Sequence, residues 1–293
     1  MSILNVPYFA YGSNLDLHHL RTWCAERGHD ARGLRPLGQA FLPDHRLAFH
    51  YRSRSWGGSA ADVTAALGVA VPGVLFEFDD DALRALDEKE GAPIRYRKEA
   101  CMAIGNDGKL QRAFTYQVTD AYREDFIAPS DAYVETIARG LVAFGLSRVH
   151  LDAARRNERL GPDPKRVFVY GTLKRGQDKH HLLDDVGATY RGEGSIEGRL
   201  VDLGEYPGVT WGTPGELVRG EVYELPEVNV FRELDAWEDF DGYGHPQNLF
   251  ERTIVEASLE TTASRKSRVP VWAYFYAQDA LGARALPGGR WPR

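Results

Sequence analysis

Two glutamates hold positions that suit proton transfer. In the segment DDDALRALDEKEG, Glu90 follows Leu86 by four residues and Leu83 by seven, so on a helix its carboxylate shares the face of these apolar side chains. Desolvation and the negative end of the helix dipole both raise the pKa of an inward carboxylate at a helix C-terminus, toward the range of a general acid/base. The structural alternative is a buried glutamate paired with an arginine such as Arg95 or Arg97.

The same arrangement occurs again 148 residues later. Glu238 follows Leu234 by four residues and Phe231 by seven. A structural ion pair would have to occur separately in both copies, whereas a repeated function explains both glutamates. We therefore expect Glu238 to be a second inward acid/base.

A turn with backbone donors and a hydroxyl also occurs twice. YFAYGSNL (8–15) is matched by VFVYGTLK (167–174), and in each a strand-like run leads through Gly12 or Gly171 into a segment that can begin a helix. Such a turn presents consecutive N–H groups at one point, which suits a carboxylate or an oxyanion. A single turn of this kind is usually only structural, but its recurrence ahead of a glutamate favours a binding loop.

These landmarks indicate a duplicated domain, with the two loops 159 residues apart. Strand-like runs correspond as well: VLFEF (74–78) with EVYEL (221–225), and AFTYQV (113–118) with VWAYFYA (271–277). Strands outnumber helices and are rich in aromatic residues. The pattern predicts an α+β class, with a small antiparallel or mixed barrel and edge helices in each copy.

The seam between the copies is predicted near Gly161, where Gly and Pro residues follow a charged, helix-like end. The predicted domains are residues 1–160 and 165–293. Acidic N-cap candidates and Gly91 predict a helix of about three turns over 79–91. Apolar residues at helical spacing over 130–158 predict one or two further helices in the first copy only.

Composition limits the class of protein. The 293 residues are 43% hydrophobic and 27% charged, as in a globular chain, and the net charge of −6 argues against nucleic acid or anionic lipid as partners. No basic leader or long apolar run occurs, and Cys24 and Cys101 form no disulfide framework, so we expect a soluble cytoplasmic protein. Metal-ligand spacing, phosphate-binding loops and a GxSxG motif are missing from the sequence, so we expect no metal or cofactor.

The order and spacing of these motifs resemble a known family. YFAYGSNL, WGGSAADV (56–63), LDEKEG and APSDAYVETIARG (128–140) make the first copy resemble gamma-glutamylcyclotransferase. VFVYGTLKRG, GEVYEL, LDAWE and LFERT make the second resemble the branch of gamma-glutamylamine cyclotransferase and the AIG2-like proteins. The resemblance implies a five- or six-stranded barrel in each copy, with the loop and the glutamate facing one cavity.

The resemblance also implies residue roles. Glu90 and Glu238 are the implied acid/base residues. The implied contacts to a gamma-glutamyl substrate are Tyr8, Phe9, Ala10, Tyr11, Gly12, Ser13, Asn14 and Tyr133 in the first copy, and Tyr170, Gly171, Thr172 and Leu173 in the second. The second copy departs from its branch at Phe250, where a tyrosine is usual, so a hydroxyl is missing there.

The implied reaction needs no nucleophile from the protein. The glutamate takes a proton from the substrate's α-ammonium, the freed amine attacks its own γ-carbonyl, and the same glutamate protonates the leaving amine, so that 5-oxoproline forms. The loop N–H groups are suited to hold a carboxylate or the developing oxyanion. The alternative function is a module that binds small gamma-glutamyl carboxylates without turnover.

Overall fold

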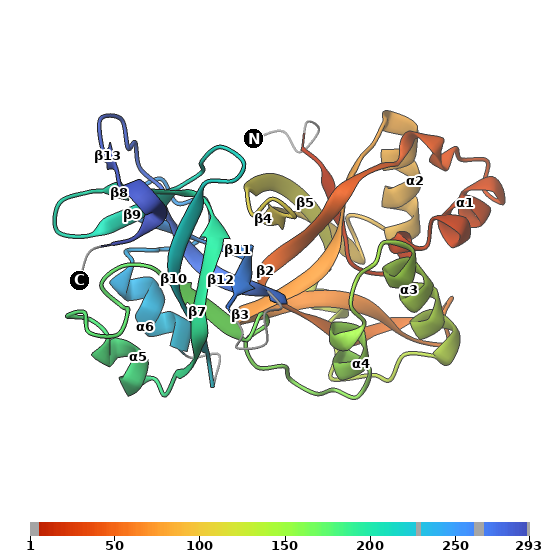
Figure 1. The fold of residues 1–293 in the computed structure, drawn as a ribbon. Helices are drawn as coiled ribbons and strands as arrows, with labels where there is room; N and C mark the ends of the chain where they lie inside the picture. The colour runs from red at the N-terminus through yellow and green to blue at the C-terminus, as the bar shows by residue number, and fades with distance from the viewer. Residues whose placement is uncertain (1–5, 227–229, 261–266, 292–293) are drawn as a thin grey trace. The chain divides into compact units, whose positions relative to one another are not determined.

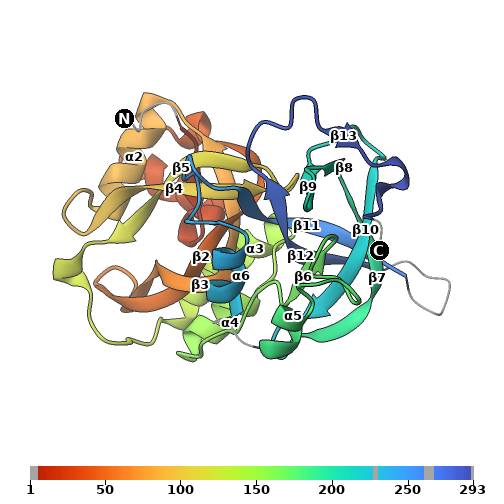
Figure 2. The ribbon, with the colours of Figure 1, turned by 90° about the vertical axis from the view of Figure 1, so that its left-hand side faces the viewer.

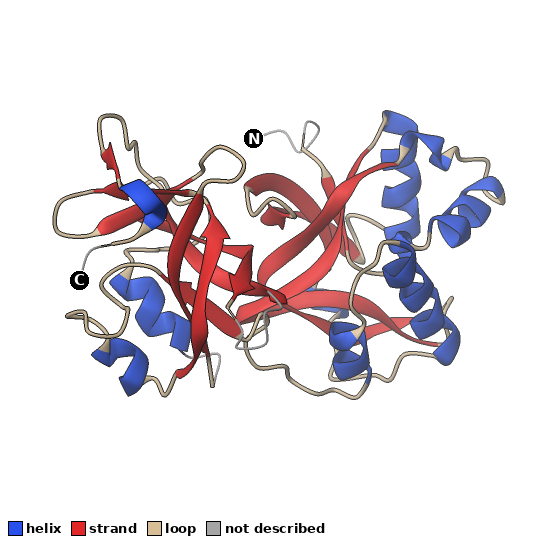
Figure 3. Cartoon of the chain, viewed as in Figure 1, coloured by secondary structure: helices blue, strands red, loops and turns tan. Residues whose placement is uncertain are grey.

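The chain forms two compact units, Met1–Leu160 and Gly161–Arg293, and each contains a closed five-stranded barrel with helices beside it (Figure 1). The computed structural model describes residues 6–226, 230–260 and 267–291. Coloured by secondary structure, both units combine strongly curved strands with short helices (Figure 3). The predicted α+β class with tandem barrels is therefore confirmed.

In the first unit the barrel order is β1-β3-β2-β4-β5, and a parallel contact between β1 and β5 at Tyr8 and Phe114 closes it. Figure 2 shows the strands β2 to β5 of this unit. All other neighbours are antiparallel, so the barrel is mixed. Its strands and helices are β1 (Tyr8–Ala10), α1 (Leu17–Ala25), β2 (Arg35–Ser53), β3 (Gly58–Glu77), α2 (Asp80–Glu90), β4 (Tyr96–Gly105), β5 (Leu110–Val118), α3 (Asp131–Ala143) and α4 (Val149–Arg155).

In the second unit the barrel order is β10-β6-β12-β11-β7, and the antiparallel pairing of β10 with β7 closes it. The parallel contact that corresponds to the one between β1 and β5 lies between β6 and β12, at Val167 and Trp272. A separate three-stranded sheet of order β13-β8-β9 accompanies it. The elements are β6 (Arg166–Val169), α5 (His181–Asp185), β7 (Thr189–Glu197), β8 (Arg199–Asp202), β9 (Pro207–Thr210), β10 (Leu217–Glu224), α6 (Val230–Trp237), β11 (Phe250–Leu259), β12 (Ser267–Tyr276) and β13 (Arg284–Ala285).

The duplication extends to single glycines in the barrel wall. A Cβ at Gly73 would lie 2.3 Å from the carbonyl oxygen of Ala10, and one at Gly220 would lie 2.2 Å from that of Val169. Both glycines therefore let the strand before the binding loop approach its antiparallel neighbour closely. The equivalent loops thus start from equivalent places in the two barrels.

The helix that carries Glu90 has the predicted caps. The side chain of Asp79 accepts from the N–H of Ala82, and Gly91 ends α2 in the left-handed conformation (φ 64°). In the second unit α6 ends one residue before Glu238, and Asp239 takes the left-handed position (φ 48°). Glu238 was expected on the helix, but it follows the helix in the turn, with its N–H bonded to the carbonyl of Leu234.

The tail of the first unit forms two helices, as predicted. Ser130 caps α3 by accepting from the N–H of Tyr133, and this places the Tyr133 side chain against the barrel. No helix within the described ranges is both long and apolar enough to cross a membrane.

Candidate active site

The binding loop and the glutamate of the first unit meet in one pocket. Asn14 donates from Nδ2 to Oε1 of Glu90 over 2.8 Å and to the hydroxyl of Tyr8 over 2.9 Å. The carbonyl oxygen of the Asn14 side chain is buried and has no hydrogen-bond partner in the described part of the chain. The residues that line the pocket are Tyr8, Tyr11, Gly12, Ser13, Asn14, Ser53, Trp56, Ala60, Ala61, Lys89, Glu90, Tyr96, Tyr116 and Tyr133.

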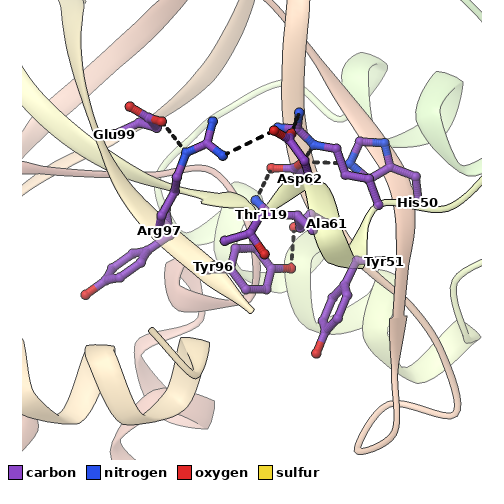
Figure 4. Close-up of polar contacts among 12 residues, drawn as sticks. His50, Tyr51, Ala61, Asp62, Tyr96, Arg97, Glu99 and Thr119 are labelled. Carbon is purple, nitrogen blue, oxygen red and sulfur yellow. Dashed lines mark hydrogen bonds and ion pairs between the residues drawn. The ribbon is translucent and has the colours of Figure 1, made fainter. Parts of the chain in front are cut away.

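Two tyrosines hold the backbone of Ala61 at the opposite wall. The hydroxyl of Tyr96 donates to the Ala61 carbonyl over 2.8 Å (Figure 4). The Ala61 N–H donates to the hydroxyl of Tyr133 over 3.1 Å. Trp56, from the WGGSAADV segment, packs on the Tyr133 ring with centroids 4.6 Å apart. The pocket wall is therefore fixed by hydrogen bonds from two other elements.

A buried carboxylate supports this wall from behind. Asp62 is fully buried beside Ala61, and it accepts from the N–H of Val118 over 3.0 Å and lies 2.6 Å from Nε2 of His50 (Figure 4). Arg123 lies 3.5 Å from the same carboxylate. The charge of Asp62 thus has partners and ties β3 to β2 and β5 at the level of the pocket.

The electrostatics of the pocket keep its hydroxyls protonated. Burial, with a further contribution from the nearby Glu90 carboxylate, raises the pKa of Tyr8, Tyr11 and Tyr133 above the ordinary value. Burial lowers the pKa of Lys89, although Glu90 opposes this, and Lys89 donates to the Ser13 hydroxyl over 3.1 Å. The pocket therefore offers neutral hydroxyl donors, one cation and one carboxylate.

Most of the loop residues expected at the site line the pocket, but two do not. Phe9 and Ala10 are fully buried in the barrel wall and are not among the lining residues. Successive strand residues point to opposite faces, so Phe9 points away from Tyr8 and packs against Gly73. Their part is to hold the strand that precedes the loop.

Lys89 was not expected at the site. It directly precedes Glu90, and adjacent residues on a helix point about 100° apart, so the apolar stripe that identified Glu90 excluded Lys89. Tyr116 was also missed. Tyr116 and Phe114 lie two residues apart in β5 and share one face of the strand, and both rings pack against Tyr8.

The second unit repeats the hydrogen bonds around its loop. Tyr11 donates to the carbonyl of Tyr116 over 2.6 Å, and Tyr170 donates to that of Tyr274 over 2.8 Å. The hydroxyl of Tyr116 then donates to Asp87 over 2.7 Å, and that of Tyr274 to Asp235 over 2.6 Å. The two copies share this chain of contacts although its aspartates were not singled out in the sequence.

The carboxylate itself has a different environment in the second unit. Leu173 is buried at the position of Asn14, and Trp237 stands at that of Lys89, so the amide and the ammonium of the first site are replaced by apolar groups. Burial, assisted by the nearby carboxylates of Asp235 and Asp239, raises the pKa of Glu238 to about 8. The prediction of a raised pKa is therefore supported for Glu238.

The other predicted loop residues of the second unit surround the same turn. Gly171 is buried against Pro207, and Thr172 is half-buried. The hydroxyl of Tyr170 also accepts from the N–H of Val209 over 3.4 Å. Phe250 is buried and packs edgewise on Tyr276, with ring centroids 5.7 Å apart, so this position supplies no hydroxyl.

Within the described residues, no three His, Cys, Asp or Glu side chains come together in an arrangement that could hold a metal ion.

Known proteins with similar sequences carry consistent names. Gamma-L-glutamyl-butirosin B gamma-glutamyl cyclotransferase of Niallia circulans is 35% identical over 114 residues, which are 39% of this chain and 67% of the relative. Gamma-glutamylaminecyclotransferase of Rattus norvegicus is 38% identical over 102 residues, 32% of this chain and 63% of the relative. A solved structure named gamma-glutamyl cyclotransferase is 24% identical with a TM-score of 0.43, and the match covers 54% of this chain and 88% of that one.

The family model described as "Gamma-glutamyl cyclotransferase, AIG2-like" matches residues 8–135 and again residues 167–293. Each match spans one barrel with its loop and its glutamate. The chain therefore belongs to the AIG2-like gamma-glutamyl cyclotransferase family and carries two tandem copies of its domain.

Proposed function

We propose that the first unit converts a gamma-glutamyl amide into 5-oxoproline and a free amine, with Glu90 as general acid/base. The observation that carries the proposal is the contact of Asn14 with Glu90, which joins the binding loop to a carboxylate inside one pocket. Among the described residues no arginine forms an ion pair with Glu90, and its carboxylate lies with Asn14 and several hydroxyls, which supports proton transfer over a structural ion pair.

The polar groups of the pocket match those of a gamma-glutamyl group. The substrate's α-ammonium can donate to Glu90 and to the unpartnered side-chain oxygen of Asn14. Its α-carboxylate can be received by Lys89, which is already within reach of Ser13. Both ends of the amino acid are then bound, and the chain is folded so that the amine faces its own γ-carbonyl.

The proton balance needs a single carboxylate. Glu90 takes one proton from the α-ammonium, and the neutral amine attacks the γ-carbonyl carbon to give a five-membered ring with an oxyanion. Backbone N–H groups of the loop at Gly12 and Ser13 are the candidate donors to that oxyanion. Glu90 passes this proton to the leaving nitrogen as its C–N bond breaks. It then takes the second proton from the positively charged ring nitrogen and hands it to the departing amine, which leaves as an ammonium ion, so 5-oxoproline is neutral at nitrogen and the enzyme ends in its starting state.

Release of 5-oxoproline from gamma-glutamyl amides by the full chain tests this proposal. With the second copy silenced by Glu238→Gln, the additional change Glu90→Gln should lower turnover by about 10²-fold or more, because an amide cannot accept the proton. Glu88→Gln is the matched control, since Glu88 lies on the same helix, is exposed and pairs with His29. Turnover that survives Glu90→Gln would show that this carboxylate is not the acid/base, and saturable binding of gamma-glutamyl compounds without any turnover would favour the binding module.

A further inference from the structure

A second cavity adjoins the pocket at Glu90. It has a volume of about 310 Å³, and it shares Ser53 and Glu90 with the pocket that contains the binding loop. The residues that line it are Tyr51, Arg52, Ser53, Arg54, Ser55, Glu90, Arg95 and Tyr122. Apart from Glu90, every charged residue of this cavity is an arginine.

Two of these arginines have charges that the described part of the protein does not neutralise. The third arginine, Arg52, has an ion-pair partner, since it lies 3.6 Å from Glu124. Within the described residues, Arg54 and Arg95 have neither an ion-pair nor a side-chain hydrogen-bond partner, and both are exposed. The cavity therefore presents two available guanidinium groups, which favour binding of a carboxylate.

Hydrogen bonds fix the backbone of Arg95. The N–H of Arg95 donates to the carbonyl of Gly91, and the carbonyl of Arg95 accepts from the N–H of Thr119, each over 2.9 Å. On the other side the Tyr51 ring packs edge-on against Tyr96, with centroids 5.3 Å apart (Figure 4). The cavity thus combines positioned positive charge with an aromatic wall.

We propose that this cavity is the subsite for the leaving amine and that Arg54 and Arg95 select amines that carry a carboxylate. The inference rests on the proposed function, in which Glu90 protonates the leaving nitrogen. That nitrogen must then lie beside Glu90, and since the glutamyl portion fills the pocket of the loop, the substituent on the nitrogen extends into the adjoining cavity. The favoured substrates are gamma-glutamyl derivatives of amino acids or short peptides, rather than of cationic or uncharged amines.

A pair of substrates that differ only in charge tests this selectivity. Gamma-glutamyl-alanine and gamma-glutamyl-alaninamide have nearly the same shape, and the readout is the ratio of their kcat/KM values for the full chain with Glu238→Gln. We expect a ratio of about tenfold in favour of the carboxylate at low salt, because two partly exposed ion pairs contribute modestly. The ratio should shrink in 0.5 M sodium chloride.

The variants assign the selectivity to the two arginines. Arg54→Gln combined with Arg95→Gln should bring the ratio close to one, and Arg95→Glu should reverse it in favour of the amide. Arg21→Gln, a change at an exposed arginine of α1 that lines neither cavity, should keep the ratio of the starting chain. The proposal would be overturned by a ratio near one in the chain whose cavity is unchanged. It would also be overturned by a carboxylate preference that persists in the double variant.

Binding measurements separate this proposal from the proposed function. If neither amide is turned over, the proposed function fails, and the same comparison is made with dissociation constants from calorimetry. A carboxylate preference in binding that the double variant abolishes would still support the subsite. Equal affinities, or no binding of either compound, would contradict it.

Discussion

The side-chain amide of Asn14 lies 2.8 Å from the carboxylate of Glu90, and the matching position ahead of Glu238 is occupied by Leu173. One copy thus has a donor to its carboxylate at a place where the other has an aliphatic group. The loops begin from equivalent strands with equivalent tyrosine contacts, so the two positions correspond and carry different side chains. Replacing Asn14 by leucine therefore tests what the amide contributes.

We expect Asn14→Leu to lower the kcat/KM of the first copy by about 10-fold or more, because it removes a hydrogen bond to a charged group and leaves the Tyr8 hydroxyl without its donor. The measurement is 5-oxoproline release in the Glu238→Gln chain. Asn14→Asp is the companion variant, since it keeps the shape but places a second carboxylate beside Glu90, and it should be at least as harmful. Full activity in both variants would show that the amide does not position the reacting groups.

Titration of Glu238 is the second prediction. Its pKa of about 8, raised by burial and by two neighbouring carboxylates, means that the folded chain holds this proton at neutral pH. Carboxyl ¹³C signals that are present in the starting chain and missing in Glu238→Gln should therefore titrate near pH 8. A midpoint near 4.5, the ordinary value, would contradict the environment described for this site.

The same shift has a consequence for stability. Between pH about 4.5 and about 8 the unfolded chain has released the proton of Glu238 while the folded chain keeps it, so folding takes up a proton and stability falls as the pH rises through this window. Glu238→Gln removes the titration. We expect the difference in melting temperature between the variant and the starting chain to increase in favour of the variant from pH 5 to pH 8. A difference that stays constant over this range would count against a proton held by Glu238.

Much of the fold was predictable because the chain repeats its landmarks. The strand runs, the α2 caps at Asp79 and Gly91 and the inward side of Glu90 follow from local periodicity, which a sequence displays directly. The contacts of Tyr116 with Asp87 and of Tyr96 with Ala61 join elements far apart in the chain, and no local pattern specifies them. Sequence periodicity therefore identified the carboxylates but not the side chains that surround them.

The aspartates of the two copies have different cations, and this leads to a fourth prediction. Asp87 lies 2.8 Å from Lys98, whose side chain is 23% exposed, whereas Asp235 lies 3.0 Å from Arg252, whose side chain is fully buried. Loss of one partner from a buried pair leaves an uncompensated charge, which costs about 3–5 kcal/mol, while a partly exposed pair contributes about 1 kcal/mol or less.

Arg252→Met and Lys98→Met form the matched pair of variants for this comparison. Arg252→Met should destabilise the second unit strongly, also because the guanidinium lies over the ring of Phe231 at 4.5 Å. Lys98→Met should have a small effect on the first unit. Hydrogen exchange followed by mass spectrometry reports on each unit separately. Equal loss of protection in the two variants would mean that burial does not set the contribution of these pairs.

The last prediction concerns the division of work between the copies. Tyr96 donates to the Ala61 carbonyl over 2.8 Å, whereas Phe250 begins the equivalent strand without a hydroxyl, and the second site also lacks the amide of Asn14 and the ammonium of Lys89. A missing ordinary hydrogen bond costs about 0.5–1.5 kcal/mol, which slows a site without abolishing it, but three such losses together leave little of the polar pocket. We therefore expect the first copy to account for most turnover of gamma-glutamyl amino acids, so that Glu90→Gln removes most of the 5-oxoproline released from gamma-glutamyl-alanine and Glu238→Gln removes little.

Tyr96→Phe should lower the rate of the first copy by several-fold, within the range given by one hydrogen bond. If Glu238→Gln instead removes most of the activity on this substrate, the apolar surroundings of Glu238 do not impair it, and the second copy is the principal catalyst.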